Sequence, residues 1–425
     1  MKNCEKMKIG LIGLGTVGAG VYKTLKSFNN VEIIKIAVRD LNKPRNIDGF
    51  DNSLLTTDAF EIVNNPEIQV VVELAGGITP AYELLKSAIK NGKHVVTANK
   101  EILAKFGEEL FNLAEEHNRV ILYEAAIGGG IPIIMPIKTI LAGNNITKVE
   151  AIVNGTTNYI LTKMDVQGAS YDDVLKEAQE LGYAEADPTG DVEGFDATYK
   201  ITTLATIIFK KRIKVENVYR EGISKIRSQD MKAANDLGYK IKLIAIGQIE
   251  NGRADVRVHP MLVSKKSTLA HIDYVTNAVT LTGHPVGSVT LSGPGAGEFP
   301  TASSVVGDIL AIANEIYKTE NVLPMMRCNH KEQAEMIDIS ETVNKYYLSI
   351  NAKNNKGVIG KIGTICANNG LSLRSIVQRD VSEDNTADIT VITELVREKD
   401  IQKAIAQFEE DEFINKVNSL IRVQY

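Results

Sequence analysis

A cluster of glycines near the start of the chain has the spacing of a phosphate-binding loop. Gly13, Leu14, Gly15, Thr16, Val17 and Gly18 form G-x-G-x-x-G between an apolar strand-like run and a segment with helical spacing. In this context the first glycine permits a tight turn, the second lets the main chain approach a pyrophosphate, and the third allows close packing of helix on strand. The helix would also point free N–H groups at the phosphates. The motif predicts a dinucleotide site, and the alternative is a strand-to-helix turn that binds nothing.

The end of the second predicted strand indicates which dinucleotide is bound. A carboxylate at this position holds the ribose 2′-hydroxyl of NAD, whereas an arginine accommodates the 2′-phosphate of NADP. Arg39 lies closer to the strand end than its neighbour Asp40, and Lys43 and Arg45 follow. The pattern favours NADP and leaves NAD as a usable cofactor, unless these are only solvated loop charges.

Carboxylates crowd the segment from Glu185 to Asp196, directly before an apolar stretch with helical spacing. Asp196 and Lys200 are four residues apart, so they share one face of that helix and can pair. A lysine held by an aspartate can exchange a proton with an alcohol or carbonyl oxygen while a hydride moves at the carbon. Because a carboxylate favours the ammonium form, the pair suits acid catalysis in the reducing direction. The alternative is an ordinary ion pair.

A second lysine, Lys100, follows the apolar run His94–Thr97. Ligands of open α/β sheets bind outside the carboxyl ends of the strands, so a cation there can orient a substrate or a cofactor. A lysine that opens a helix is otherwise an ordinary solvated residue, and this prediction therefore depends on its neighbours.

These residues need a scaffold, and the first third of the chain has the pattern of alternating strands and helices. The predicted strands are Lys8–Ile12, Val31–Val38, Val70–Leu74, His94–Thr97 and Val120–Glu124, and the predicted helices are Val17–Phe28, Ala81–Asn91 and Lys100–His117. Such alternation predicts a parallel sheet covered on both faces, which is a Rossmann-type doubly wound α/β fold.

The pattern changes after Pro136, and we expect three domains. They are a dinucleotide-binding domain over residues 1–136 with a return helix near 301–320, an α+β catalytic and dimerisation domain over 137–323, and a C-terminal module over 345–425. In the second domain the pattern predicts strands at 149–154, 255–263, 276–282 and 288–292 and helices at 171–181 and 195–211. In the module it predicts strands at 345–352, 372–379, 387–395 and 421–425 and helices at 358–368 and 398–409, a ferredoxin-like βαββαβ order. The polar stretch 324–331 predicts a linker, so a chain truncated after residue 331 should stay folded and catalytically competent.

Charge and composition limit the classes of partner. The net charge of −5 is spread without long runs of one sign, so the chain lacks the basic stripe of nucleic-acid binders. It also lacks the run of about 18 apolar residues that a membrane span requires, and no signal segment precedes the first strand. Cys4, Cys328 and Cys366 have no metal-ligand spacing, which is typical of reduced structural thiols. We expect a cytoplasmic protein that binds small molecules.

Five separated segments between Lys8 and about Leu323 resemble, in the same order, the motifs of homoserine dehydrogenases. They are Thr97–Lys100, Glu124–Pro132, Gly155–Ile160, Leu181–Lys200, and Gly293–Gly297 taken together with Thr301–Ser304. The resemblance implies interconversion of L-homoserine and L-aspartate 4-semialdehyde with a nicotinamide cofactor, in the biosynthesis of threonine, methionine and isoleucine. It also implies a homo-oligomer.

The resemblance further implies roles for single residues. Lys200 is the expected proton donor with Asp196 as its partner, and Glu185 is the carboxylate that holds the amino group of the substrate. Lys100 is expected to be shared by substrate and nicotinamide. The remaining site residues are Thr156, Tyr183 and Asp191 on the substrate side and Thr97, Gly297 and Thr301 on the cofactor side.

Glu124 with the main-chain carbonyls of Ile127, Gly129 and Ile131 resembles a monovalent-cation site of the same family. Oxygen-only ligands suit a hard ion such as sodium. The alternative is a glycine-rich turn that joins two domains, and the sequence leaves both open.

The final module resembles an ACT domain, a fold that often binds an amino acid between paired copies. Asn354–Gly360 matches its first strand-to-helix loop, although Lys356 stands where the usual motif has proline. The resemblance implies an amino-acid effector, with threonine as the first candidate, and a purely dimerising role stays open.

Two other functions stay open as well. One is another two-domain NAD(P) oxidoreductase that acts on a different carbonyl substrate, although the segment Glu185–Lys200 argues against it. The other is a non-catalytic, amino-acid-sensing protein that keeps a dinucleotide domain and an ACT domain without turnover.

Overall fold

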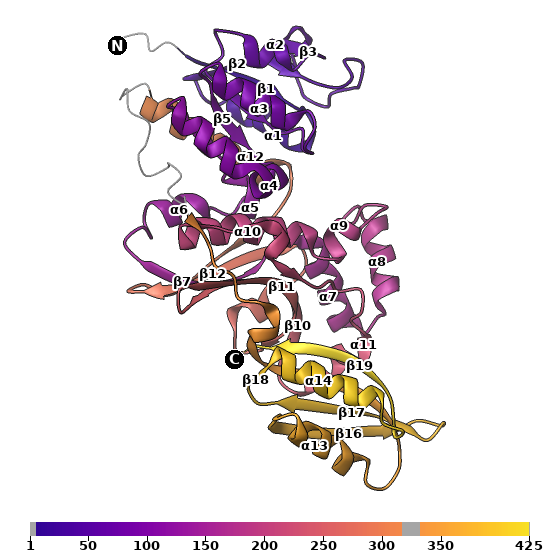
Figure 1. Ribbon diagram of the computed structural model, residues 1–425. Coiled ribbons are helices and arrows are strands. Elements are labelled where there is room, and N and C mark those ends of the chain that lie inside the picture. Colours follow the sequence, from indigo (N-terminus) through magenta and orange to yellow (C-terminus); the bar gives the residue numbers. More distant parts are fainter. Residues whose placement is uncertain (1–5, 317–331, 425) are drawn as a thin grey trace. The chain divides into compact units, whose positions relative to one another are not determined.

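The computed structural model describes residues 6–316 and 332–424 (Figure 1). Contacts divide the chain into two compact units. Unit 1 comprises residues 1–149, 199–218 and 276–334, and unit 2 comprises residues 150–198, 219–275 and 335–425. The linker predicted at 324–331 and two of the three cysteines, Cys4 and Cys328, lie outside the described residues.

Unit 1 is built on a parallel sheet with the strand order β3-β2-β1-β4-β5-β6. Its first elements are β1 (Met7–Ile12), α1 (Thr16–Leu25), β2 (Val31–Ala37), β3 (Leu55–Thr56), α2 (Phe60–Asn64), β4 (Val70–Glu73), α3 (Ala81–Lys90), β5 (His94–Thr97), α4 (Lys100–Glu116), β6 (Ile121–Leu122), α5 (Ala125–Gly128) and α6 (Ile134–Lys138). This arrangement confirms the predicted Rossmann-type sheet. The short elements β3 and α2 have no counterpart in the prediction.

The later part of unit 1 consists of strands outside this sheet and of one helix that packs back onto α1. It contains β8 (Lys211–Arg212), β12 (Thr276–His284), β13 (Gly287–Pro294), α12 (Glu298–Ile316) and β14 (Glu332–Gln333). Helix α12 packs on α1, since Ala302, Val305 and Ile309 share one apolar core with Val21 and Leu25. The elements β7 (Asn145–Ile152) and α10 (Phe195–Phe209) contain residues of both units.

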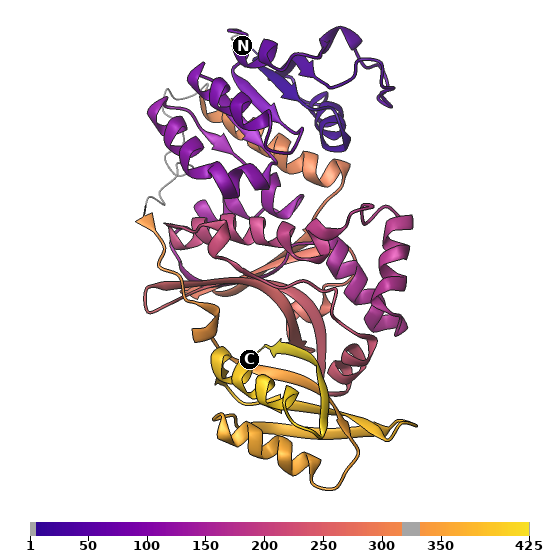
Figure 2. The same ribbon diagram turned by 45° about the vertical axis from the view of Figure 1, so that its right-hand side comes forward.

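Unit 2 joins a helical layer to a mixed sheet. Its elements are α7 (Gly155–Gln167), α8 (Tyr171–Glu180), α9 (Thr189–Val192), β9 (Tyr219–Arg220), α11 (Ser228–Asp236), β10 (Tyr239–Glu250), β11 (Arg253–Ser264), β15 (Val343–Lys353), α13 (Val358–Asn368), β16 (Leu373–Val381), β17 (Thr386–Thr393), β18 (Val396–Arg397), α14 (Glu398–Glu409) and β19 (Ile414–Val423). Neighbouring strands follow the order β10-β11-β19-β15-β17-β16. Helices α13 and α14 share a core with the last four of these strands (Figures 1 and 2).

We call residues 335–424 the C-terminal module. Its βαββαβ order is as predicted, but β19 begins at Ile414 rather than near Ile421. Because β19 also pairs in parallel with β11, through Met261 with Arg422 and Leu262 with Val423, the module continues the sheet of the preceding domain. A chain that ends after residue 331 would therefore lack the strand that pairs with this edge of β11.

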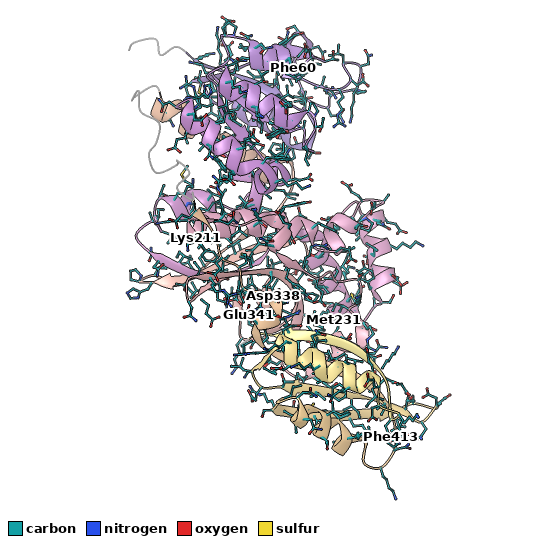
Figure 3. All side chains as sticks on the ribbon, in the orientation of Figure 1. Phe60, Lys211, Met231, Asp338, Glu341 and Phe413 are labelled. Atoms are coloured by element: carbon teal, nitrogen blue, oxygen red, sulfur yellow. The ribbon has the colours of Figure 1, made fainter. Side chains whose placement is uncertain are left out.

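A buried carboxylate strengthens this junction. Asp230, in the first turn of α11, is fully buried and forms an ion pair with Arg227. It also accepts hydrogen bonds from the hydroxyls of Tyr347 at 3.1 Å and Ser419 at 2.7 Å, which belong to β15 and β19. The guanidinium of Arg227 donates in turn to Ser349 on β15. Figure 3 labels Asp338 and Glu341 in the segment that leads into β15.

Among the described residues, no helix combines the length and the apolar character needed to cross a lipid bilayer. Cys366 lies in the core of the C-terminal module without a disulfide, and burial raises the pKa of its thiol to about 11. A thiol in this state is a small apolar core group.

The junction predicts the behaviour of a shortened chain. Ending the chain after residue 331 leaves Asp230 without two of its donors and exposes the apolar edge of β11 around Met261. A hydrogen bond to a charged group contributes about 1.5–3 kcal/mol. We expect the shortened chain to aggregate, or to unfold several degrees below the full chain, by size-exclusion chromatography and thermal unfolding. A monodisperse fragment with an unchanged midpoint would restore the expectation drawn from the linker.

Candidate active site

The glycine loop of unit 1 has a conformation that only glycine allows at two positions. Gly13 has φ +102°, and a Cβ there would lie 2.9 Å from the main-chain nitrogen of Ala75. A Cβ on Gly18 would lie 2.3 Å from the carbonyl oxygen of Gly13, so this glycine permits the close packing of α1 on β1. Nothing lies within 4 Å of a Cβ on Gly15, which leaves its main chain open to a ligand. Thr16 and Val17 form the first turn of α1.

A cavity of about 410 Å³ opens beside this loop. Gly13, Leu14 and Gly15 line it on one side, and Arg39, Asp40, Lys43 and Arg45 line it at the end of β2. The carboxylate of Asp40 accepts a hydrogen bond from the N–H of Asn42 at 2.8 Å, and Arg45 donates to the carbonyl of Asp40. Asp40 therefore shapes the turn, and the cavity wall carries three cationic side chains.

The carboxyl ends of β4 and β5 are held together by Glu73, which the sequence did not suggest. Its carboxylate is fully buried and accepts hydrogen bonds from the N–H groups of Ala75 and Gly76 and from the hydroxyl of Thr97 at 2.8 Å. Burial raises the pKa of Glu73, and these hydrogen bonds act in the opposite direction. Because the side chain of Thr97 is buried and bonded to Glu73, any contact of Thr97 with a cofactor would involve its main chain.

Lys100 starts α4, directly after the end of β5, as predicted. The preceding residue, Asn99, caps the helix by accepting a hydrogen bond from the N–H of Ile102 and donates to the carbonyl of Gly77 at 2.7 Å. The lysine is half-buried at the edge where ligands of parallel sheets bind.

Two glycine-rich segments that are far apart in the sequence pack together in unit 1. A Cβ on Gly129 would lie 2.2 Å from the carbonyl oxygen of Gly295, and the N–H of Gly130 donates to the carbonyl of Pro294. Gly297, with φ +121°, precedes α12 and accepts a hydrogen bond from the N–H of Thr301. The resemblance motifs at 124–132 and 293–304 thus meet in one place.

Glu124 stabilises this region by its side chain. Its buried carboxylate accepts hydrogen bonds from the main-chain N–H groups of Ile133, Ile134 and Met135, which open α6. Its own N–H donates to Asp308 on α12 at 2.9 Å. Burial raises the pKa of both carboxyl groups. The carbonyl of Gly129 accepts a hydrogen bond from Ser304, and Ile127 and Ile131 are buried beside it.

In unit 2 the acidic segment is organised by Asn154, another residue that the sequence did not suggest. Its amide donates to Asp191 at 2.7 Å and to Asp196 at 2.9 Å, so one side chain holds two predicted site carboxylates. The amide oxygen of Asn154 accepts from the N–H of Thr157 and thereby caps α7. We call Asn154, Asp191 and Asp196 the amide clamp.

The other predicted substrate residues lie around the same segment. The hydroxyl of Thr156, in the first turn of α7, donates to the carbonyl of Tyr183 at 2.6 Å. The side chain of Tyr183 is exposed, and its ring centroid lies 4.8 Å from the ring centroid of Tyr159. Glu185 is exposed in the loop before α9, where its carbonyl accepts from Gln179.

Helix α10 carries the predicted proton-transfer pair. Asp196 is in its first turn and Lys200 is four residues further, and both are at most 8% exposed. Charged side chains are seldom buried unless they are paired or serve a chemical purpose. Because Asp196 and Lys200 are both buried, an ordinary solvated ion pair is a poor description.

Three family models match separate parts of the chain. Residues 132–310 match the model of the homoserine dehydrogenase family, residues 13–124 match the homoserine dehydrogenase NAD-binding domain, and residues 346–413 match the ACT domain. Homoserine dehydrogenases from Synechocystis and Neisseria gonorrhoeae are 42% and 41% identical, over 98% and 99% of this chain and 99% of each relative.

Solved structures give the same result. The crystal structure of a homoserine dehydrogenase from Thiobacillus denitrificans is similar with a TM-score of 0.93 and 38% identity, covering 99% of this chain and 98% of that one. A hyperthermophilic archaeal homoserine dehydrogenase in complex with NADPH has a TM-score of 0.63 and 30% identity, covering 75% of this chain and all of that one. A dinucleotide fold, an ACT domain and relatives of one activity along the whole chain exclude the two competing functions, and the chain belongs to the homoserine dehydrogenase family of NAD(P)-binding oxidoreductases.

Proposed function

We propose that the chain reduces L-aspartate 4-semialdehyde to L-homoserine with NADPH, and that Lys200 gives the proton to the substrate oxygen. The observation that carries this proposal is the amide clamp, which holds Asp196 at the start of α10, one turn before the buried Lys200. Bound NADPH would supply the hydride. A carboxylate on the same helix face favours the ammonium form of the lysine, which is the form that can protonate an alkoxide.

The other residues of unit 2 suit the recognition of an amino-acid substrate. Asp191 and Glu185 supply negative charge toward a substrate ammonium, and Thr156 and Tyr183 fix the loop that carries Glu185. We assign Lys100 the role of a cation for the substrate carboxylate or the nicotinamide amide, because it lies at the carboxyl end of β5.

NADPH is the proposed cofactor because the cavity at the end of β2 is lined by Arg39, Lys43 and Arg45. A 2′-phosphate would face this group of cations, whereas the carboxylate of Asp40 is already bonded to the main chain of its own turn. Guanidinium groups bind phosphate with two parallel hydrogen bonds, which gives Arg39 the larger share of the selectivity. NAD remains usable.

The cation site proposed at Glu124 fits the donors that the structure shows. A carboxylate offers about four acceptor positions, and three of those on Glu124 are used by α6. The remaining position, the carbonyls of Ile127 and Ile131, and the second lone pair of the Gly129 carbonyl, whose first accepts from Ser304, would suit a sodium ion. The alternative is a structural turn without an ion, in which the hydrogen bonds of Glu124 to α6 alone hold the segment.

We also propose that the chain forms a homo-oligomer and that an amino acid, threonine first, binds to the C-terminal module. Its first loop is ordered by hydrogen bonds between Asn354 and Asn385, and Gly357 caps α13 with φ +90°. Lys356 is exposed in that loop. Effector binding and assembly both remain roles for this surface.

Replacement of Lys200 tests the proton donor. We expect Lys200→Ala to lose at least ~100-fold in kcat, because positioned acid-base groups usually contribute that much. The Kd for NADPH should not change, since the cofactor cavity is built from other residues.

Glu185→Gln should instead raise KM for the semialdehyde, because it removes a charge partner of the substrate. Steady-state kinetics and fluorescence titration measure these quantities, and more than about a tenth of kcat left in Lys200→Ala contradicts its role.

Replacement of Arg39 tests the cofactor preference. Arg39→Ala should raise the Kd for NADPH by about tenfold and leave the Kd for NADH nearly constant, because only NADPH has a phosphate to lose a partner. Lys35→Ala is the matched control, since Lys35 lies on β2 and pairs with Glu61 rather than lining the cavity. Equal weakening of both cofactors would show that Arg39 does not read the 2′-phosphate.

A further inference from the structure

A short segment of unit 2 connects the C-terminal module to the acidic segment. We call residues 219–223 the strap. Its first two residues form β9, which pairs in parallel with β11 through Tyr219 with Arg257 and Arg220 with Val258. The N–H of Glu221 donates to the carbonyl of Val258 at 2.8 Å and extends this pairing. The strap is therefore fixed along one side by a long, buried strand.

The other side of the strap lies directly against the turn of α9. Arg220 donates to the carbonyl of Glu193, and the N–H of Ile223 donates to the carbonyl of Val192 at 2.8 Å. Between them, a Cβ on Gly222 would lie 2.5 Å from that carbonyl oxygen of Val192, so only glycine permits this approach. The guanidinium carbon of Arg220 also lies 3.4 Å from the ring centroid of Phe195.

This turn lies between the two carboxylates of the amide clamp. Asp191 belongs to α9, and Asp196 follows at the start of α10, with the contacts of the strap at Val192, Glu193 and Phe195 between them. The strap therefore touches the chain on the segment that separates the two carboxylates. A shift of the strap would move that segment and alter where Asp191 and Asp196 lie.

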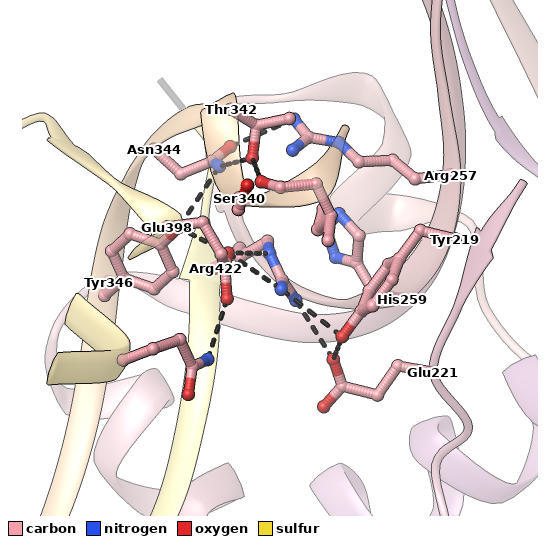
Figure 4. A network of polar contacts seen from close by, with 12 residues as sticks. Tyr219, Glu221, Arg257, His259, Ser340, Thr342, Asn344, Tyr346, Glu398 and Arg422 are labelled. Atoms are coloured by element: carbon pink, nitrogen blue, oxygen red, sulfur yellow. Dashed lines mark hydrogen bonds and ion pairs between the residues drawn. The ribbon is translucent and has the colours of Figure 1, made fainter. Parts of the chain in front are cut away.

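An ion pair holds the strap to the C-terminal module (Figure 4). Arg422 on β19 is 2% exposed and bonds to Glu398 at 2.9 Å and to Glu221 at 3.0 Å. The hydroxyl of Tyr219 donates to the same Glu221 oxygen. His259 lies beside this pair, and burial together with the guanidinium groups of Arg422 and Arg257 keeps its pKa well below the usual range. The guanidinium of Arg422 is thus paired with two carboxylates, those of Glu398 and Glu221.

We propose that Arg220, Glu221 and Arg422 are positioning residues for the reaction, through which the C-terminal module holds the amide clamp in place. The inference rests on the proposed function, because it takes Asp191 and Asp196 to belong to the substrate site. Arg422 stays buried because two carboxylates surround it, and Glu221 is the one of them that belongs to the strap. Loss of the Glu221 charge removes the ion pair between the strap and β19 and leaves the longer contact of Arg422 with the hydroxyl of Tyr219, at 3.5 Å, while Arg422 keeps Glu398.

The experiment compares two isosteric substitutions, each at an Arg–Glu pair that joins the C-terminal module to the preceding domain. One pair involves the strap and the other involves β11. Glu221→Gln breaks the pair of the strap. Glu341→Gln breaks the pair of Glu341 with Arg253, in which both guanidinium Nη atoms lie 3.1 Å from the carboxylate. Neither residue of this control pair belongs to the strap. Semialdehyde reduction, NADPH titration and thermal unfolding are measured for both variants, for Glu221→Asp and for Arg220→Met.

Glu221→Gln should lower kcat/KM for the semialdehyde by about tenfold, because a displacement near 1 Å is enough for such a loss. Its Kd for NADPH should stay as in the unchanged chain, and Glu341→Gln should keep full kcat/KM. Glu221→Asp, which retains the charge, should recover part of the loss. Arg220→Met should behave like Glu221→Gln, and the double variant should be no worse than either, because both act through one contact.

Full kcat/KM in Glu221→Gln overturns the proposal, and so does an equal loss in Glu341→Gln. Asp191→Asn and Asp196→Asn separate the two levels of inference. If these variants are impaired and Glu221→Gln is not, only the positioning role fails. If Asp191→Asn and Asp196→Asn are both fully active, the proposed substrate site fails, and the positioning role fails with it.

Discussion

A carboxylate that is taken out of water must receive hydrogen bonds or charge partners from the surrounding chain, and this constraint decides how the parts of this molecule are joined. Glu73 joins the ends of β4 and β5, and Glu124 joins β6 to the start of α6. Asp230 joins α11 to two strands of the C-terminal module. In each case the acid takes its donors from segments that are distant in sequence or lie beyond a turn, so its burial fixes their relative position.

The same constraint explains why the proton-transfer residues are well placed. Asp196 accepts from an amide that is itself anchored at the start of α7, so its position depends on a helix cap rather than on a flexible loop. A site whose groups are held before the substrate arrives loses little free energy to reorganisation during the reaction. Asp196 and Lys200 are buried, and a charge that is removed from bulk water interacts more strongly with its partner.

Local patterns predicted the elements whose residues repeat with a clear period. The strands of the unit 1 sheet other than β3, and the helices α13 and α14, were predicted nearly to their ends, since their apolar residues follow the period of a strand or one face of a helix. Helix α7 was missed because its residues 157–162 are all buried. Polar and apolar residues are mixed along this helix, so no apolar stripe marks one face. Residues 414–420 of β19 were missed for a similar reason, since polar side chains interrupt the strand up to Ser419.

For the site, the sequence predicted residues that belong to recognisable motifs and missed those that act by long-range contacts. Asn154, Glu73 and the strap have no local signature, because each matters through a partner that folding brings close. The pairing of β11 with β19 has a further consequence of this kind. β11 is synthesised long before the strand that covers its edge at Met261, so the nascent chain must keep an apolar strand edge unpaired until β19 emerges. Growing chains of this enzyme should therefore depend on chaperones at that interval, and association between copies would begin at β11.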